Sequence, residues 1–186
     1  MSFSNGSRLK KKNKNKSIKL DIGCGDYKKE GYIGIDRFSR PGVDLVIELE
    51  TQQLPYENNT VDEIYCSHLI EHLSDPIKLI EEFNRVLKIG GKLTLIVPHY
   101  TNPYACSIAH KTYWSLMSID QEILDYYTDT EFILLSKQIC VSFILDENWL
   151  DRLVNMVLNA NQKFYERYLS LIYRVWEIRF VMVKKE

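Results

Sequence analysis

Residues 18–36 read IKLDIGCGDYKKEGYIGID, and this stretch decides the fold of the chain. Its two apolar runs, 18–22 and 32–36, have the length and composition of short buried strands. Gly23 and Gly25 follow the first run directly, and glycines at the end of a strand allow a ligand to approach the backbone closely. The stretch therefore predicts two strands with a ligand-binding turn between them.

The turn differs from the dinucleotide-binding fingerprint G-x-G-x-x-G, which has a third glycine and an acid about 20 residues further on. Lys28 stands at the position of the third glycine, and only ten residues separate Gly25 from Asp36. A full crossover helix barely fits, so a smaller nucleoside-like cofactor is favoured over a dinucleotide. Asp36 would then accept hydrogen bonds from ribose hydroxyls. The alternative is a tight turn with a surface acid and no ligand.

The rest of the chain continues the alternation of strands and helices. Helical periodicity predicts a helix from Ser74 or Asp75 to Gly90, and mostly helical structure over 148–175. Apolar runs predict further strands at 43–47, 61–66, 92–97, 132–135, 139–145 and 177–183. This order favours an α/β fold with a parallel sheet, whose ligands bind beyond the carboxyl ends of the strands. The residues expected to converge there are Asp21, Gly23, Cys24, Gly25, Asp36, Glu48, Ser67 and His68.

Length and composition indicate one domain. The chain has 186 residues, 45% of them hydrophobic, and we expect a single domain over 17–186 after a flexible lysine-rich tail at 1–16. The formal net charge of −1 gives no whole-molecule attraction to nucleic acid, although the tail offers a weak contact with RNA or anionic lipid. The four cysteines form no C-x-x-C pair, and no apolar run approaches 20 residues. These features favour a cytoplasmic protein without a transmembrane segment.

Four segments together resemble a known enzyme family. They are LDIGCGDYKKEGYIGIDR (20–37), GVDLVIELE (42–50), LPYENNTVDEIYCSHLIEHL (54–73) and EEFNRVLKIGGKLTLIVPH (81–99). In this order they resemble the class I S-adenosylmethionine-dependent methyltransferases, particularly the small type 11 group, over residues 17–116. The resemblance implies a Rossmann-like, mostly parallel seven-stranded sheet with helices on both faces and an antiparallel last strand.

The resemblance also implies roles for single residues around S-adenosylmethionine. Asp21, Gly23, Cys24 and Gly25 would surround its methionine part, and Asp36 would hold the ribose. Glu48 and Leu49 match the place beside the adenine, with a glutamate where the family often has an aspartate. Ser67 and His68 would lie near the cofactor or the methyl acceptor.

The histidines in His68-Leu-Ile-Glu71-His72 allow several interpretations. H-x-x-E-H is a zinc-peptidase signature, but its place after a predicted strand in a methyltransferase frame argues against a peptidase. A divalent metal could bind among His68, Glu71, His72, His99 and His110, and the histidines favour Zn, Fe, Co or Ni over Mg. Alternatively, His110, His72 or His68 is a catalytic base, with His110 preferred. The third alternative is a structural or acceptor-orienting role.

The predicted function is methyl transfer to a small-molecule, glycan or lipid-precursor acceptor. RNA is an alternative acceptor because of the lysine-rich tail. A second alternative is a cofactor-binding pseudoenzyme that serves as a protein-interaction module. The chain is expected to be a monomer or a homodimer, and the amphipathic stretch 148–175 packs on the sheet, forms a dimer face or lies on a membrane surface.

Overall fold

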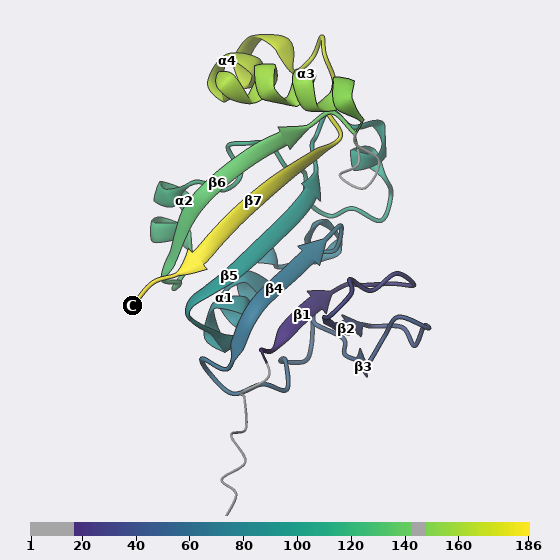
Figure 1. Ribbon diagram of the computed structural model, residues 1–186, viewed down its shortest axis with the longest axis vertical. Coiled ribbons are helices and arrows are strands. Elements are labelled where there is room, and N and C mark those ends of the chain that lie inside the picture. Colours follow the sequence, from purple (N-terminus) through teal and green to yellow (C-terminus); the bar gives the residue numbers. More distant parts are fainter. Residues whose placement is uncertain (1–16, 143–147) are drawn as a thin grey trace, which may run out of the picture.

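The computed structural model describes residues 17–142 and 148–186 (Figure 1). The tail at 1–16, with its predicted flexibility and RNA contact, and residues 143–147 lie outside the described residues. Seven strands form one sheet. They are β1 (Lys19–Ile22), β2 (Ile33–Asp36), β3 (Leu45–Val46), β4 (Val61–Ser67), β5 (Leu87–Pro98), β6 (Phe132–Cys140) and β7 (Glu177–Lys184).

The strand order is β3-β2-β1-β4-β5-β7-β6. The first five strands in this order pair in parallel, so their carboxyl ends meet at one edge of the sheet. β7 runs antiparallel to both of its neighbours, β5 and β6. This topology confirms the predicted fold class, a mostly parallel seven-stranded sheet with an antiparallel last strand. Its order reverses between β1 and β4, and ligands of such sheets bind where the order reverses.

α1 (Pro76–Val86) begins where the sequence predicts and ends earlier. The Asp75 side chain accepts a hydrogen bond from the Lys78 amide at 3.1 Å and caps the first turn. The predicted helix continued to Gly90, but β5 already begins at Leu87, which pairs with Val61. The glycine is then part of a strand rather than the end of the helix. Pairing between strands outweighs local helical periodicity at this point.

Helices α1 and α2 (Gln121–Tyr127) lie behind the sheet in Figure 1. They cover apolar side chains such as Ile64, Leu93 and Phe180, which are fully buried. In the described ranges, loops replace the crossover helices between β1 and β2 and between β2 and β3. The expected helices on both faces are therefore not seen there, because these connections are too short to hold them.

The face of the sheet opposite α1 carries charged side chains in cross-strand register. Glu63 on β4 lies between Lys19 on β1 and Lys92 on β5. Its carboxylate is 2.7 Å from the Lys92 ammonium and 3.1 Å from that of Lys19. Since opposite charges directly across a sheet stabilise strand pairing, this row joins three parallel strands on a solvent-exposed face.

The end of the chain beyond β5 differs from the prediction in two ways. β6 is one strand, whereas separate strands were predicted at 132–135 and 139–145, of which 143–145 lie outside the described residues. The stretch 148–175 divides into α3 (Trp149–Ala160), α4 (Gln162–Phe164) and a π-helical turn, η4 (Tyr165–Leu169). In Figure 1 these helices lie over the end of β6 and β7.

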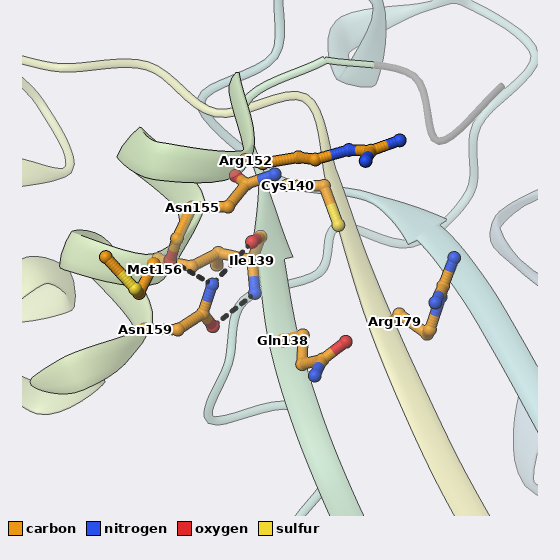
Figure 2. Close-up of a pocket in the computed structure, with 8 residues that line it drawn as sticks. All are labelled: Gln138, Ile139, Cys140, Arg152, Asn155, Met156, Asn159 and Arg179. Atoms are coloured by element: carbon orange, nitrogen blue, oxygen red, sulfur yellow. Dashed lines mark hydrogen bonds between the residues drawn. The ribbon is translucent and has the colours of Figure 1, made fainter. Parts of the chain in front are cut away.

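Asparagine side chains of α3 form hydrogen bonds with backbone groups along the outer edge of β6. The amide of Ile139 donates to Oδ1 of Asn159 at 2.9 Å, and Nδ2 of the same asparagine donates to the Ile139 carbonyl at 2.8 Å. Asn155 accepts from the amide of Val141 at 2.8 Å. These bonds cover an edge that would otherwise be open to another strand. Figure 2 shows the two bonds between Asn159 and Ile139 beside a cavity of about 280 Å3 between α3 and the sheet.

Candidate active site

A cavity of about 300 Å3 lies at the carboxyl ends of β1, β2 and β4, where the strand order reverses. This volume is at the lower end of the range for small-molecule sites. Residues from the ends of three strands and from the loop after β3 line it. Six of them were predicted from the sequence to bind the cofactor: Gly23, Gly25, Asp36, Glu48, Leu49 and His68.

The glycine turn after β1 forms one wall of the cavity. Gly23 and Gly25 have φ angles of 74° and 55°, which glycine adopts without strain. A Cβ on Gly23 would lie 2.9 Å from Cβ of Leu69, so this glycine is required by packing. A Cβ on Gly25 would meet no atom within 4 Å, so its hydrogen faces open space that a ligand can occupy.

Asp36 ends β2 and is fixed by two backbone bonds. The Gly25 amide donates to its Oδ2 at 3.1 Å, and the Phe38 amide donates to its Oδ1 at 3.0 Å. Each carboxylate oxygen can accept a further hydrogen bond. The carboxylate is therefore oriented in advance and can still accept from a pair of ligand hydroxyls.

Three predicted cofactor residues do not line this cavity: Asp21, Cys24 and Ser67. Asp21 is 4% exposed and accepts from the Lys29 amide at 2.7 Å, so it holds the loop after β1; burial raises its pKa, and Lys29 partly offsets this. The Cys24 thiol lies near the Gly42 carbonyl at 3.6 Å, and burial together with nearby carboxylates raises its pKa to about 11. Ser67 shares its face of β4 with Tyr65.

His68 follows β4 directly and has a φ of 52°, which is uncommon outside glycine. Its Nε2 lies 2.7 Å from Oε1 of Glu177, and its Nδ1 lies 3.4 Å from Oε1 of Glu71. Burial lowers the pKa of His68, but hydrogen bonds and charge from the two glutamates outweigh this effect and raise it to about 9. Both ring nitrogens of His68 therefore face glutamate carboxylates.

Glu71 and His72 lie on the short helix η1 (Ile70–His72), and the loop after β5 brings His110 to them. The amides of Lys111 and Thr112 both donate to the Glu71 carbonyl, at 2.8 and 3.2 Å, and this fixes the loop on η1. The imidazole rings of His72 and His110 then meet edge to face, with their centroids 4.6 Å apart. His72 also lines the cavity, so this cluster adjoins the candidate cofactor site.

His99 lies apart from this cluster, although it was a metal candidate. It is 0% exposed, and its Nδ1 is 2.7 Å from the Thr101 hydroxyl. Its Nε2 is 3.1 Å from Oε2 of Glu166, a residue of η4. His99 therefore joins the end of β5 to η4.

The sequence did not point to Glu177 or Phe38. Glu177 begins the last strand, 109 residues after its partner His68, and an acid at the start of an alternating strand gives no local signal. Phe38 lines the cavity beside Asp36 and is half exposed, with the Arg37 guanidinium 4.6 Å from its ring centroid. Ligands of such sheets bind beyond the carboxyl ends of the strands, so a search of the two residues after Asp36 would have found Phe38.

A family model described as a methyltransferase domain, of the type 11 group, matches residues 35–95. The matched region runs from the end of β2 through β3, β4, η1 and α1 into β5, and it contains Asp36, His68 and His72. About a third of the chain thus matches a methyltransferase domain of the type 11 group. The predicted resemblance is thereby confirmed, while the roles of single residues stay predictions.

Curated relatives match less than half of the chain. It is 31% identical over 87 residues to the chloroplastic 2-methyl-6-phytyl-1,4-hydroquinone methyltransferase of Arabidopsis thaliana, covering 47% of this chain and 25% of that protein. It is 28% identical over 107 residues to a sterol 4-C-methyltransferase of Caenorhabditis elegans, covering 46% of this chain and 32% of that protein. The chain therefore spans only a quarter to a third of the length of these relatives.

Solved methyltransferase structures share the fold over nearly the whole chain. A SAM-dependent methyltransferase from Archaeoglobus fulgidus has a TM-score of 0.58 at 18% identity, covering 90% of this chain and 86% of that one. Phosphoethanolamine N-methyltransferase 2 of Haemonchus contortus, in complex with S-adenosylmethionine, has a TM-score of 0.58 at 15% identity, covering 91% of this chain and 49% of that one. At these identities the likeness concerns the fold.

Proposed function

We propose that the chain transfers a methyl group from S-adenosylmethionine to a small, largely apolar acceptor of the lipid-precursor class. The observation that carries this proposal is the cavity at the strand ends, where Gly25 leaves its backbone open and Asp36 is oriented by two amides. Asp36 would accept hydrogen bonds from the ribose hydroxyls. Glu48 and Leu49 would lie beside the adenine, and Gly23 and Gly25 along the methionine part.

The chemistry needs little beyond alignment. A sulfonium methyl is strongly electrophilic, so the protein has to hold an acceptor atom in line with the S–CH3 bond and keep water away. The bond from sulfur to the methyl carbon breaks, a bond from the acceptor to this carbon forms, and S-adenosylhomocysteine leaves. Where the acceptor must lose a proton, a base or a water molecule at the cavity has to receive it.

An apolar surface on the last helices supports the lipid-precursor class. We call the following residues the apolar cap surface, because all are exposed on or just after α3, α4 and η4: Trp149, Leu150, Leu153, Met156, Val157, Phe164, Tyr168, Leu171, Ile172 and Tyr173. The same stretch carries four basic and two acidic residues over 149–174. Aromatic, aliphatic and basic side chains together favour contact with a lipid surface or an amphiphilic molecule.

The place of the apolar cap surface also supports this acceptor. His99 and Tyr100, at the end of β5, bond to Glu166 of η4 and to Ser170, the latter at 2.8 Å. The helices that carry the apolar cap surface are thus attached at the same edge of the sheet as the cavity. Two relatives are named for lipid acceptors, a phytyl hydroquinone and a sterol. In the described ranges, no helix is long and apolar enough to cross a membrane.

The test is transfer of a labelled methyl group from S-adenosylmethionine into an extract of the source cells. The extract is separated into lipid, water-soluble and RNA fractions, and Asp36→Ala is the matched control. We expect the wild-type chain to transfer label to the lipid fraction, and Asp36→Ala to transfer none. Label confined to RNA or to water-soluble glycans would contradict the acceptor class. Binding of the cofactor without transfer to any fraction would identify a pseudoenzyme.

A further inference from the structure

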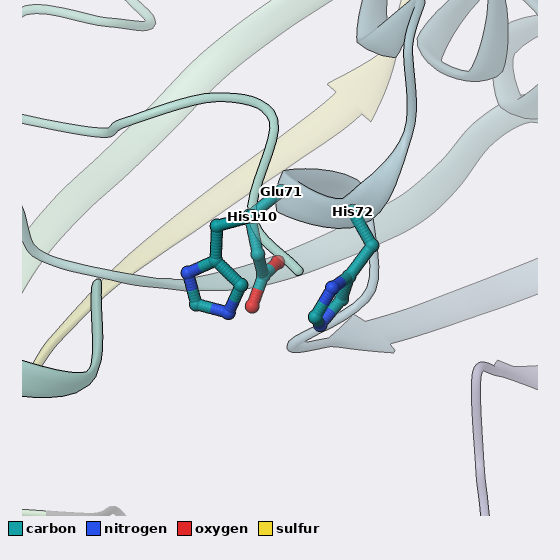
Figure 3. Close-up of side chains that lie close together, drawn as sticks. All are labelled: Glu71, His72 and His110. Carbon is teal, nitrogen blue, oxygen red and sulfur yellow. The ribbon is translucent and has the colours of Figure 1, made fainter. Parts of the chain in front are cut away.

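Glu71, His72 and His110 form a cluster beside the cofactor cavity. One potential ligand atom from each side chain lies within 4.8 Å of those of the other two. Figure 3 shows the Glu71 carboxylate between the two imidazole rings, with Glu71 and His72 coming from η1 and His110 from the loop after β5. Two imidazole nitrogens and one carboxylate oxygen are a common ligand set of zinc.

The Glu71 carboxylate is the least expected member of this cluster. It is 0% exposed, and neither of its oxygens makes a hydrogen bond of good geometry among the described residues. The nearest charged group is the His68 ring, at 3.4 Å from one oxygen. This single long contact compensates the burial of the carboxylate only in part, and a cation bound to its oxygens would reduce the remaining cost. The side chain is thus placed as a ligand would be.

The two histidines are oriented in the way that metal ligands usually are. Nδ1 of His72 donates to the Ala109 carbonyl at 3.0 Å, and Nδ1 of His110 donates to the Ala105 carbonyl at 3.0 Å. A carbonyl oxygen can only accept, so the proton of each neutral ring is on Nδ1 and the lone pair is on Nε2. Metal-binding histidines commonly donate their other ring nitrogen to a backbone carbonyl in this manner.

We propose that Glu71, His72 and His110 bind one divalent transition-metal ion, with Zn2+ the best fit to the ligand set. Ligands around zinc lie about 2.0–2.2 Å from the metal, so small side-chain rotations would draw the three groups together. His68 and His99 are not ligands, because glutamates already engage their rings. Three protein ligands leave at least one coordination position for a small molecule.

The proposal gives the open coordination position a role, and this part rests on the proposed function. His72 lines the cavity that holds the cofactor site, so the ion would lie at the acceptor side of that cavity. An oxygen atom of the acceptor, such as a hydroxyl, would bind the ion. The ion would then orient the acceptor toward the sulfonium methyl. The binding of zinc itself does not depend on methyl transfer.

The test uses the untagged chain of 186 residues, from which metal has been removed with a chelator. Calorimetry with Zn2+ is compared for wild type, His72→Gln, His110→Gln and Glu71→Gln, with Asp36→Ala as the control in the same cavity. We expect one ion per chain, at least about tenfold weaker binding in each of the three cluster variants, and unchanged affinity in the control. No binding, or equal affinity in wild type and in folded cluster variants, would overturn the proposal.

A second measurement uses the wild-type chain alone, so it holds even if a variant does not fold. In histidine side-chain NMR spectra, addition of Zn2+ should shift the Nε2 resonances of two of the four imidazoles, those of His72 and His110. Shifts at His68 or His99 instead would overturn the ligand assignment. S-adenosylhomocysteine binding is measured on the same samples. A chain that binds zinc but not S-adenosylhomocysteine would contradict the proposed function. A chain that binds S-adenosylhomocysteine but not zinc would contradict only the metal site.

Discussion

Nε2 of His68 and Oε1 of Glu177 lie 2.7 Å apart, although Glu177 is 109 positions further along the chain. The bond joins the turn after β4 to the first residue of β7. It crosses the carboxyl end of β5, which lies between these two strands. Through this bond the last strand of the sheet fixes a histidine that lines the cofactor cavity, in a backbone conformation that only a few residues other than glycine adopt.

Glu177→Ala should loosen His68 and weaken the site. The variant loses a hydrogen bond to a charged group, and we expect the free energy of unfolding to fall by about 1–2 kcal/mol, since His68 is about one-third exposed. Urea unfolding measures this effect, and calorimetry should show weaker binding of S-adenosylhomocysteine. Exposed Glu30→Ala is the control. Unchanged ligand affinity in Glu177→Ala would mean that the bond does not position His68 for the cofactor.

Two glycines of the same turn should respond differently to alanine. Gly23→Ala places a Cβ 2.9 Å from Leu69, at a φ of 74°, and should reduce the free energy of unfolding by about 1–3 kcal/mol. Gly25→Ala meets no protein atom, so it should lower stability less and reduce cofactor affinity more. Thermal melts and calorimetry on both variants give the comparison. Equal effects on stability and on affinity would argue against a ligand at Gly25.

The sequence predicted this turn well because its signals are local. A strand, two glycines and an acid at the next strand end are enough to place Asp36 beside the turn. The resemblance implied a cofactor role for Asp21, which stays a prediction; in the structure its buried carboxylate accepts from the Lys29 amide. The bond from His68 to Glu177 was not predictable, because it depends on β7 lying between β5 and β6. Likewise, the sequence predicted four histidines near one edge of the sheet. It could not show that His99 bonds to Glu166 while His110 bonds to the Ala105 carbonyl, because these contacts depend on side-chain packing.

Acid should weaken the charged row across β1, β4 and β5. Burial raises the pKa of Glu63, but Lys92, Lys19 and Tyr32 outweigh this and lower it to about 2. A depressed carboxyl pKa contributes stability that is present above the unfolded value near 4.5 and is lost as the pH falls toward 2. We expect Glu63→Gln to lose about 1 kcal/mol at neutral pH and to show a flatter stability profile between these pH values. Urea midpoints measured against pH, with Glu30→Gln as the control, test this, and parallel profiles for wild type and Glu63→Gln would contradict it.

The apolar cap surface should carry contact with lipid. Leu171 and Ile172 are 82% and 81% exposed, so aspartate at both positions should leave stability nearly unchanged. The double variant Leu171→Asp with Ile172→Asp should bind vesicles of mixed neutral and anionic lipid several-fold more weakly in a flotation assay, because it loses apolar contact and adds negative charge. Ile89→Asp changes an exposed apolar residue of β5 and should bind as wild type does. Absence of vesicle binding by wild type would contradict this surface as a lipid contact.

The central claim is that the cavity lined by Gly25 and Asp36 binds S-adenosylmethionine. Titration calorimetry with S-adenosylhomocysteine tests it most directly, because this product binds without turnover. We predict one binding site per chain in wild type. In Asp36→Ala the affinity should fall at least about tenfold, which corresponds to a loss of about 1.4 kcal/mol or more of binding free energy. In Asp129→Ala, whose side chain lies on the loop before β6, the affinity should not change. No binding by folded wild type, or equal affinity in Asp36→Ala, would contradict the account.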